Sequence, residues 1–223
     1  LGDGSSDVTT FTAGVTATAP SQVNLAGTIQ TTNTTMSVGD AGTPIVLTAN
    51  TILSGNTAGA ITLGGTVNGA YSLTVNTTGN TTFTHAVGNT TALTTLTTNT
   101  SGTTYINGGA ITTSSTQTYG DAVVLGADTT LTTTDSNITF GSTVDGDGTA
   151  RDLTLDMDNG ADADGTVQFA NTVGANSLDV IDITGNLNLD AAISNTTSLS
   201  VSGTSDLGAD VTTTSTQTYT SGV

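Results

Sequence analysis

The amino-acid sequence predicts an all-β fold, a parallel β-solenoid with rungs of about 20 residues. First, strong helix formers are scarce, because Glu and Lys are absent and Arg occurs once. Second, the abundant Thr, Val and Ile are branched at Cβ and favour strands. Third, a short apolar motif recurs along the chain in the same sense each time, with Gly, Asn, Asp and Ser between its copies.

The charge composition narrows the classes of partner. All 18 acidic residues are Asp, the one basic residue is Arg151, and the formal net charge is −17. Binding to nucleic acid needs a basic patch, so we expect no nucleic-acid partner, and an anionic membrane surface would repel the chain. No run of about 18 apolar residues occurs, so no transmembrane segment is expected. Cysteine is absent, which excludes disulfides and thiolate metal sites.

Disorder is the alternative that high net charge and 4% aromatic residues suggest. Only 9% of the residues are charged, however, and the mean hydropathy is +0.06. The apolar residues are also periodic, which favours a folded chain.

The recurring motif is apolar-x-apolar-x-x-x-apolar. Its first two positions have the period of a strand with one buried face, and the residues before the last position suit a bend. The copies are Val23/Leu25/Ile29, Ile61/Leu63/Val67, Ile138/Phe140/Val144, Val167/Phe169/Val173 and Leu187/Leu189/Ile193, with Thr first in Thr9/Phe11/Val15 and Thr81/Phe83/Val87. Strand, corner and strand recurring about every 20 residues is the pattern of a solenoid rung.

Longer matches divide the chain into two units. Residues 115–119 (STQTY) recur at 215–219, and residues 61–69 match 138–146. We therefore predict one solenoid segment, 1–223, with units at about 43–120 and 121–220, cut from a longer repeat array. An immunoglobulin-type β-sandwich is the rival fold, but it would use antiparallel hairpins and usually a core Trp, and Trp is absent.

The sharpest local feature is an Asp-rich corner after residue 155. Asp156, Asp158, Asp162 and Asp164 are candidate calcium ligands, because clustered hard oxygens with Gly at sharp turns suit Ca²⁺. No Glu closes the loop as in an EF-hand, and a solvated acidic loop is the preferred interpretation. No cofactor is required, and calcium is the one candidate. Arg151 is expected to form a surface pair with an Asp of this region.

The sequence offers no catalytic residues. His85 is the only histidine and is expected at an exposed corner, where a structural role is favoured. No Cys is present to act as a nucleophile, and no pair of carboxylates stands out from the other Asp residues. Tyr105, Tyr119 and Tyr219 are expected to cap or border the core. We therefore predict that the chain is not an enzyme.

Thr-x-Thr is frequent, as at residues 16–18, 82–84 and 116–118. Arrays of this motif occur in ice-binding solenoids, so an ice-binding Thr-rich solenoid is one alternative function. The motif is not expected to recur at one fixed position of the rung, and the Thr-rich composition accounts for its frequency.

Residues 115–119, 121–131 and 138–146 resemble the filamentous-haemagglutinin-like and autotransporter-type β-strand-repeat surface proteins of bacteria. The resemblance covers most of residues 43–223 and its motifs are of low complexity. It implies a right-handed β-helix, an extracellular or cell-surface location, and a structural or adhesive role in an adhesin or an extracellular filament. It also implies self-association into fibres or continuation of the same chain, with a host or glycan surface as a possible target. A glycan-binding or glycan-cleaving β-helix module is the other alternative function.

Overall fold

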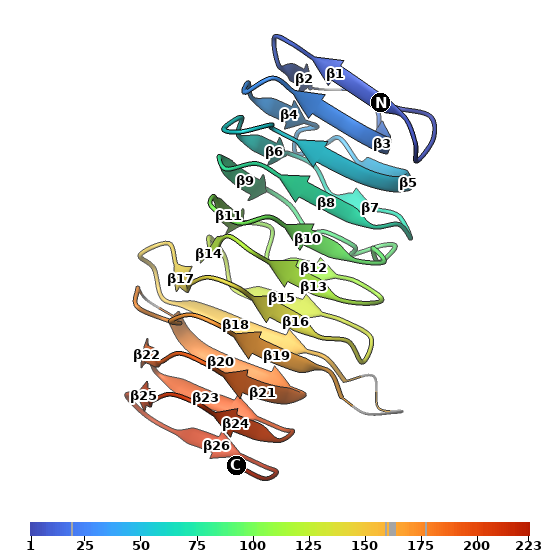
Figure 1. The fold of residues 1–223 in the computed structure, drawn as a ribbon. Coiled ribbons are helices and arrows are strands. Elements are labelled where there is room, and N and C mark those ends of the chain that lie inside the picture. Colours follow the sequence, from blue (N-terminus) through green and yellow to red (C-terminus); the bar gives the residue numbers. More distant parts are fainter. Residues whose placement is uncertain (19, 159, 161–163, 177) are drawn as a thin grey trace.

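The computed structural model describes residues 1–18, 20–158, 160, 164–176 and 178–223. Throughout these residues the chain is all-β, without helix, and winds into a parallel β-solenoid of about ten turns spaced by about 21 residues. Figure 1 shows the turns stacked in sequence order, with the two termini at opposite ends of the stack. The predicted fold class is confirmed.

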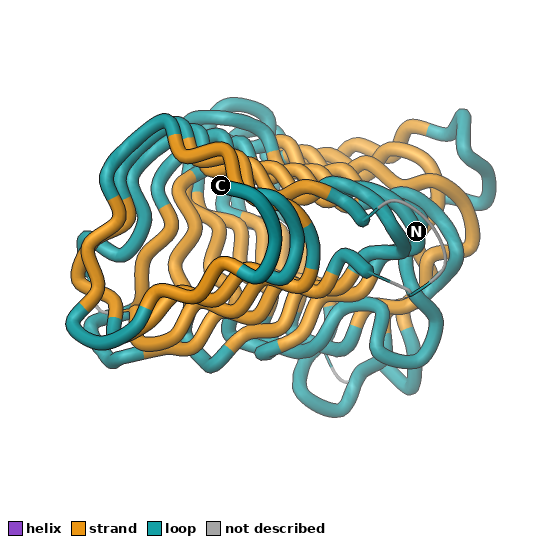
Figure 2. The backbone as a smooth tube through the Cα atoms, turned by 90° about the horizontal axis from the view of Figure 1, so that it is seen from below, coloured by secondary structure: helices purple, strands orange, loops and turns teal. Residues whose placement is uncertain are grey.

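Each turn runs along three faces, and each strand pairs in parallel with strands of the neighbouring turns. Viewed along the stack, successive turns follow nearly the same path (Figure 2). Face 1 carries β1 (Val8–Phe11), β3 (Val23–Thr31), β5 (Ile45–Ser54), β8 (Leu73–Asn76), β10 (Leu96–Thr98), β13 (Gln117–Tyr119), β16 (Ile138–Phe140), β19 (Thr166–Phe169), β21 (Asn186–Leu189) and β24 (Ser205–Leu207).

Face 2 carries β2 (Val15–Ala17), β4 (Met36–Val38), β6 (Ile61–Leu63), β9 (Asn80–Phe83), β11 (Thr103–Ile106), β14 (Ala122–Leu125) and β17 (Val144–Gly146). It is continued through a bridge at Val173 to β22 (Ile193–Thr196) and β25 (Val211–Thr213). Face 3 carries β12 (Ala110–Thr112), β15 (Thr129–Thr132), β18 (Arg151–Asp156), β20 (Leu178–Thr184), β23 (Ser198–Val201) and β26 (Gln217–Tyr219). The first residues of β3 and β5, together with β7 (Val67–Asn68), extend face 3 toward the N-terminus.

The core is a narrow column of inward side chains, because alternate residues of every strand point to the axis. On face 1 one inward row contains three rings: Tyr119, Phe140 and Phe169 lie in register in consecutive turns. Each neighbouring pair of rings is stacked at 5.2 Å between centroids. A thin core is thus filled by stacking like residues from turn to turn.

A buried polar pair lies inside this column. The Tyr119 hydroxyl donates to Gln117 Oε1 at 2.8 Å, and Gln117 Nε2 donates to the carbonyls of Ile111 and Thr132. Both side chains are fully buried, so each polar atom needs its partner.

Asparagine and aspartate side chains at the corners bind the next turn. Asn68 Oδ1 accepts hydrogen bonds from the backbone N–H groups of Thr90 and Thr91, and Asn137 Oδ1 accepts one from Thr166. These bonds satisfy corner amides that the strand ladders leave unpaired.

The recurring motif describes one strand and one corner, and copies of it lie at different corners of the turn. Ile61/Leu63/Val67 runs from face 2 to face 3, whereas Ile138/Phe140/Val144 runs from face 1 to face 2. The STQTY copies also differ, because Gln117 lies on face 1 and Gln217 on face 3. Copies of the motif therefore occupy different corners of the turn, while the predicted rung of about 20 residues agrees with the observed spacing of about 21 residues.

Candidate functional site

A candidate ligand site lies on face 2, where β11, β14 and β17 are neighbours. Ile106 and Leu125 point into the core, so the preceding Tyr105 and Val124 point outward. Tyr105 pairs in register with Val124, and Val124 pairs with Asp145 in the next turn. An aromatic, an aliphatic and an acidic side chain therefore follow one another along the outer surface.

A loop after β17 turns this surface into a groove. Residues 147–150 leave the strand and are exposed, and Gly148 has a φ of +98° with open space around it. The groove is lined by Tyr105, Val124, Gly146, Asp147, Gly148 and Asn176, and has a volume of about 430 Å³. We call it the face-2 groove. In Figure 1 the loop projects beside β17.

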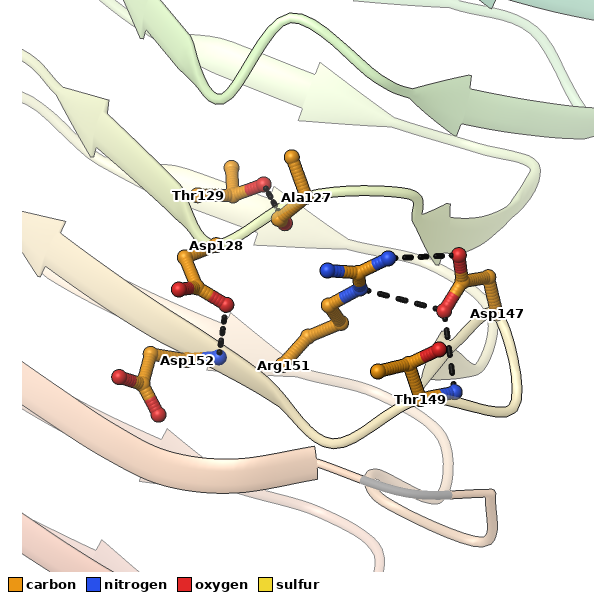
Figure 3. A network of polar contacts seen from close by, with 7 residues as sticks. All are labelled: Ala127, Asp128, Thr129, Asp147, Thr149, Arg151 and Asp152. Atoms are coloured by element: carbon orange, nitrogen blue, oxygen red, sulfur yellow. Dashed lines mark hydrogen bonds and ion pairs between the residues drawn. The ribbon is translucent and has the colours of Figure 1, made fainter.

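Arg151 holds this loop in place. Its Nε donates to Asp147 Oδ1 at 3.2 Å and its Nη2 donates to Asp147 Oδ2 at 2.9 Å, a two-point contact across the loop (Figure 3). The Thr149 N–H also donates to Asp147 Oδ1. Hydrogen bonds from Arg151 and Thr149 lower the pKa of Asp147 to about 2. The expected pairing of Arg151 with a nearby Asp is confirmed.

Neighbouring carboxylates fix the backbone around the groove. Asp145 Oδ1 accepts a hydrogen bond from the Asn176 N–H at 2.8 Å, which ties the opposite wall to β17. On the far side of Arg151, Asp128 Oδ1 accepts from the Asp152 N–H (Figure 3). The groove thus has a braced polar rim and an aromatic and aliphatic floor, which is the composition of small-ligand sites.

Tyr105 and Val124 were not singled out by the sequence. The sequence predicts that Tyr105, Tyr119 and Tyr219 cap or border the core. The prediction is wrong for Tyr105, which faces outward, and for Tyr119, which is fully buried within the core. Alternation in Thr104-Tyr105-Ile106 was the available signal, because an inward Ile106 places Tyr105 outside.

The candidate calcium ligands lie after β18. Asp156 is the last residue of that strand, and Asp158 Oδ1 accepts a hydrogen bond from the Gly160 N–H. The backbone carbonyl of Asp164 accepts from Asn186 Nδ2, and Asp162 lies outside the described residues. Within the part of the chain that the structure describes, no three His or Asp side chains are grouped so as to hold a metal ion. The four-residue calcium site therefore stays a prediction.

Two other titratable groups lie at corners. His85 is half-buried, not exposed as expected, and its Nδ1 has no hydrogen-bond partner among the described residues. Asp121 is buried, and its carboxylate accepts hydrogen bonds from the Gly102 N–H and the Thr104 hydroxyl. Burial raises the pKa of Asp121. Asp121 therefore braces its corner, and in the contacts described no second catalytic group accompanies either Asp121 or His85.

The outer surface of face 1 carries a regular polar strip. Thr74, Thr97, Thr118 and Thr139 are in register in four consecutive turns. Backbone hydrogen bonds place a second row beside them, made of Ser72, Thr95, Thr116 and Asn137. Two Thr-x-Thr copies, residues 95–97 and 116–118, stack directly on face 1. The copies at 16–18 and 82–84 belong to face 2, so the motif has no single position in the turn, as expected.

Comparison with known proteins gives no relative from which a function follows: no family model, no curated protein and no solved structure matches the chain. Within the described residues, no helix has the length and apolar character needed to span a membrane. Function must therefore be argued from the surface of the solenoid itself.

Proposed function

We propose that the chain is a non-enzymatic structural and adhesive segment of an exported bacterial surface protein or extracellular filament. The observation that supports this function is the continuous parallel ladder of face 1, from β1 to β24. Ten turns at about 4.8 Å per turn make a rod about 50 Å long. Such a rod spaces and presents surfaces at a distance from the cell, and its nearest-neighbour contacts suit an extendable array.

The composition supports the same role. Aspartate is the acid throughout and Arg151 the only base, so the outer surface is anionic and soluble. The residues that line the face-2 groove include no histidine, cysteine or lysine. A structural and binding role does not require a nucleophile or a basic catalytic group.

Display on a non-adherent bacterial cell tests the adhesive part of the proposal. Cells that carry the chain on a neutral surface carrier are expected to be retained on abiotic and host-derived surfaces more than cells with the carrier alone. Equal retention on every surface would contradict adhesion.

Sedimentation of the purified chain tests self-association, and a monodisperse monomer at high concentration would contradict assembly into fibres.

Adsorption to ice is a second candidate function, favoured by the polar strip of face 1. Its two rows form an array with spacings of about 4.8 Å between strands and about 6.6 Å along each strand. The eight side chains, from Ser72 to Thr139, are hydroxyls or one amide and carry no charge. A rigid, uncharged array of this kind can match the spacing of an ordered layer of water. It is less suited to binding a flexible charged ligand.

The ice candidate is tested by thermal hysteresis and crystal shaping. The purified chain is expected to shape ice, and Thr118→Lys should abolish shaping because it places a charged chain in the middle of the strip. Thr62→Lys, on the outer surface of face 2, is the matched control and should leave shaping intact. An unmodified chain that does not shape ice removes this candidate.

A further inference from the structure

We propose that the face-2 groove binds a neutral saccharide, with one sugar ring packed on Tyr105. This inference goes beyond the structural role of the rod and does not depend on it. It rests on the floor of the groove, on its polar rim and on the charge around it.

The floor suits the apolar face of a sugar ring. Tyr105 and Val124 are half-buried neighbours in adjacent parallel strands, which lie about 4.8 Å apart. Their side chains therefore form one continuous patch. Sugar rings expose C–H groups that pack well on aromatic faces, and the hydroxyl of Tyr adds a polar handle. The volume of about 430 Å³ accommodates a small ligand.

The rim suits sugar hydroxyls. Asp147 and Asn176 both line the groove and carry a carboxylate and an amide group. An ionised carboxylate accepts more hydrogen bonds than Asp147 receives from Arg151 and Thr149, so acceptor capacity is left for a ligand. An Asn side chain both donates and accepts, as a hydroxyl does.

Charge selects a neutral ligand over an anionic one. Asp145 and Asp147 flank the groove, and the one cation nearby, Arg151, already binds Asp147. A uronate or a sulfated sugar would meet the carboxylate of Asp145, which has no cationic partner among the described contacts, and this repulsion is unfavourable at short range. A simple amine would be attracted by charge alone, and its binding would weaken steeply with salt.

Arg151 is a positioning residue in this site. It does not line the groove, but its two hydrogen bonds to Asp147 fix the loop that forms one wall. Arg151→Gln should therefore weaken saccharide binding while the stacking of Tyr105 on the ligand, seen as ring chemical-shift changes, persists.

Titration by NMR of the purified 223-residue chain tests the proposal. The probes are hexasaccharides of β-1,4-glucan, N-acetylglucosamine and mannan, with oligogalacturonate of the same length as the anionic probe. At least one neutral probe is expected to shift the resonances of Tyr105, Val124, Gly148 and Asn176, with little change when NaCl rises to about 0.5 M. Oligogalacturonate should leave them unshifted.

Variants distinguish the groove from other surfaces. Tyr105→Ala should weaken binding by about tenfold or more, since it removes the aromatic floor. Tyr71→Ala is the matched control, because Tyr71 is 39% exposed and lies outside the groove. Asn176→Ala, at an exposed loop, gives a second test that leaves the strands intact.

The results that would overturn the proposal are specific. They are no shift with any neutral probe, shifts confined to another face, equal binding of oligogalacturonate, or equal losses for Tyr105→Ala and Tyr71→Ala. Thermal melting of each variant verifies that it is folded. If Tyr105→Ala does not fold, the effect of Asn176→Ala on saccharide binding tests the proposal instead.

Discussion

At the scale of single residues, the chain uses its one cation to fix a loop. The pKa of Asp147 is lowered to about 2 from 3.8 by its hydrogen bonds with Arg151 and Thr149. A carboxyl whose folded pKa is depressed stabilises the fold above its unfolded pKa, and this contribution is lost as pH falls from about 3.8 to about 2. The acid-dependent part of the loop's stability is thus assigned to the ion pair of Asp147 and Arg151.

Arg151→Gln tests this assignment. The substitution removes the positive partner, so the pKa of Asp147 should rise from about 2 toward 3.8. Carboxyl resonances followed by NMR between about pH 1.5 and pH 6 would measure the shift, because this range includes both pKa values. An unchanged pKa of about 2 in the variant would contradict the role of Arg151.

The buried pair of Gln117 and Tyr119 is a second residue-scale feature. Tyr119→Phe removes the hydroxyl and leaves Gln117 Oε1 buried without its donor. We expect a loss of about 1–3 kcal/mol in the free energy of unfolding. Urea denaturation measures it, with Tyr71→Phe at an exposed position as the control that should change stability by less than about 0.5 kcal/mol. Equal effects of the two substitutions would refute the prediction.

At the scale of the strands, the aromatic row of face 1 is the most specific packing device. Phe140 stacks on Tyr119 and on Phe169, so Phe140→Leu removes two ring contacts, each worth about 0.5–1.5 kcal/mol beyond burial. Phe83 is equally buried, but its neighbours in the ladder are Leu63 and Ile106.

The same substitution at the two sites isolates the stacking. Phe140→Leu should cost about 1–3 kcal/mol more than Phe83→Leu in urea denaturation, the sum of two ring contacts. Similar losses at both positions would show that burial alone, and not the ring stack, stabilises this row.

The strand scale also explains the ambiguity of the repeats. A strand with alternating inward residues and a small-residue corner has the same chemistry on each face, so Ile61–Leu63 and Ile138–Phe140 match in sequence although they lie on different faces. The repeat shows which side chains point inward. It does not show which face a strand occupies.

At the scale of the whole molecule, self-repulsion opposes folding. The net charge is −17, with a single basic side chain. Raising NaCl from about 0.01 M to 0.15 M shortens the Debye length from about 30 Å to about 8 Å. The melting temperature should therefore rise, as measured by circular dichroism, and a fall would contradict this view of the charge.

Calcium compared with magnesium at equal ionic strength tests the predicted site at Asp156, Asp158, Asp162 and Asp164. Screening acts equally for the two ions, so a specific site predicts a higher melting temperature in CaCl₂ than in MgCl₂, lowered again by chelator. Identical melting curves in the two salts would contradict the calcium site and favour a solvated acidic loop.

The sequence by itself determined the fold class. Missing Glu and Lys, abundant β-branched residues and alternation around Gly and Asn corners make a parallel solenoid the consistent solution, because those features act locally. The pairing of Arg151 with a nearby Asp could also be predicted, since only one cation is present. Alternation further determined that motif residues such as Leu63 and Phe140 point inward.

Only the tertiary structure decided which strands become neighbours. Register between turns places Tyr105 beside Val124 and stacks Thr97 on Thr118, although about 20 residues separate each pair. Corners of variable length set that register: one residue separates β20 from β21, five separate β15 from β16 and nine separate β18 from β19. No local pattern encodes the sum of those lengths, so the face-2 groove and the polar strip appear only once the turns are stacked.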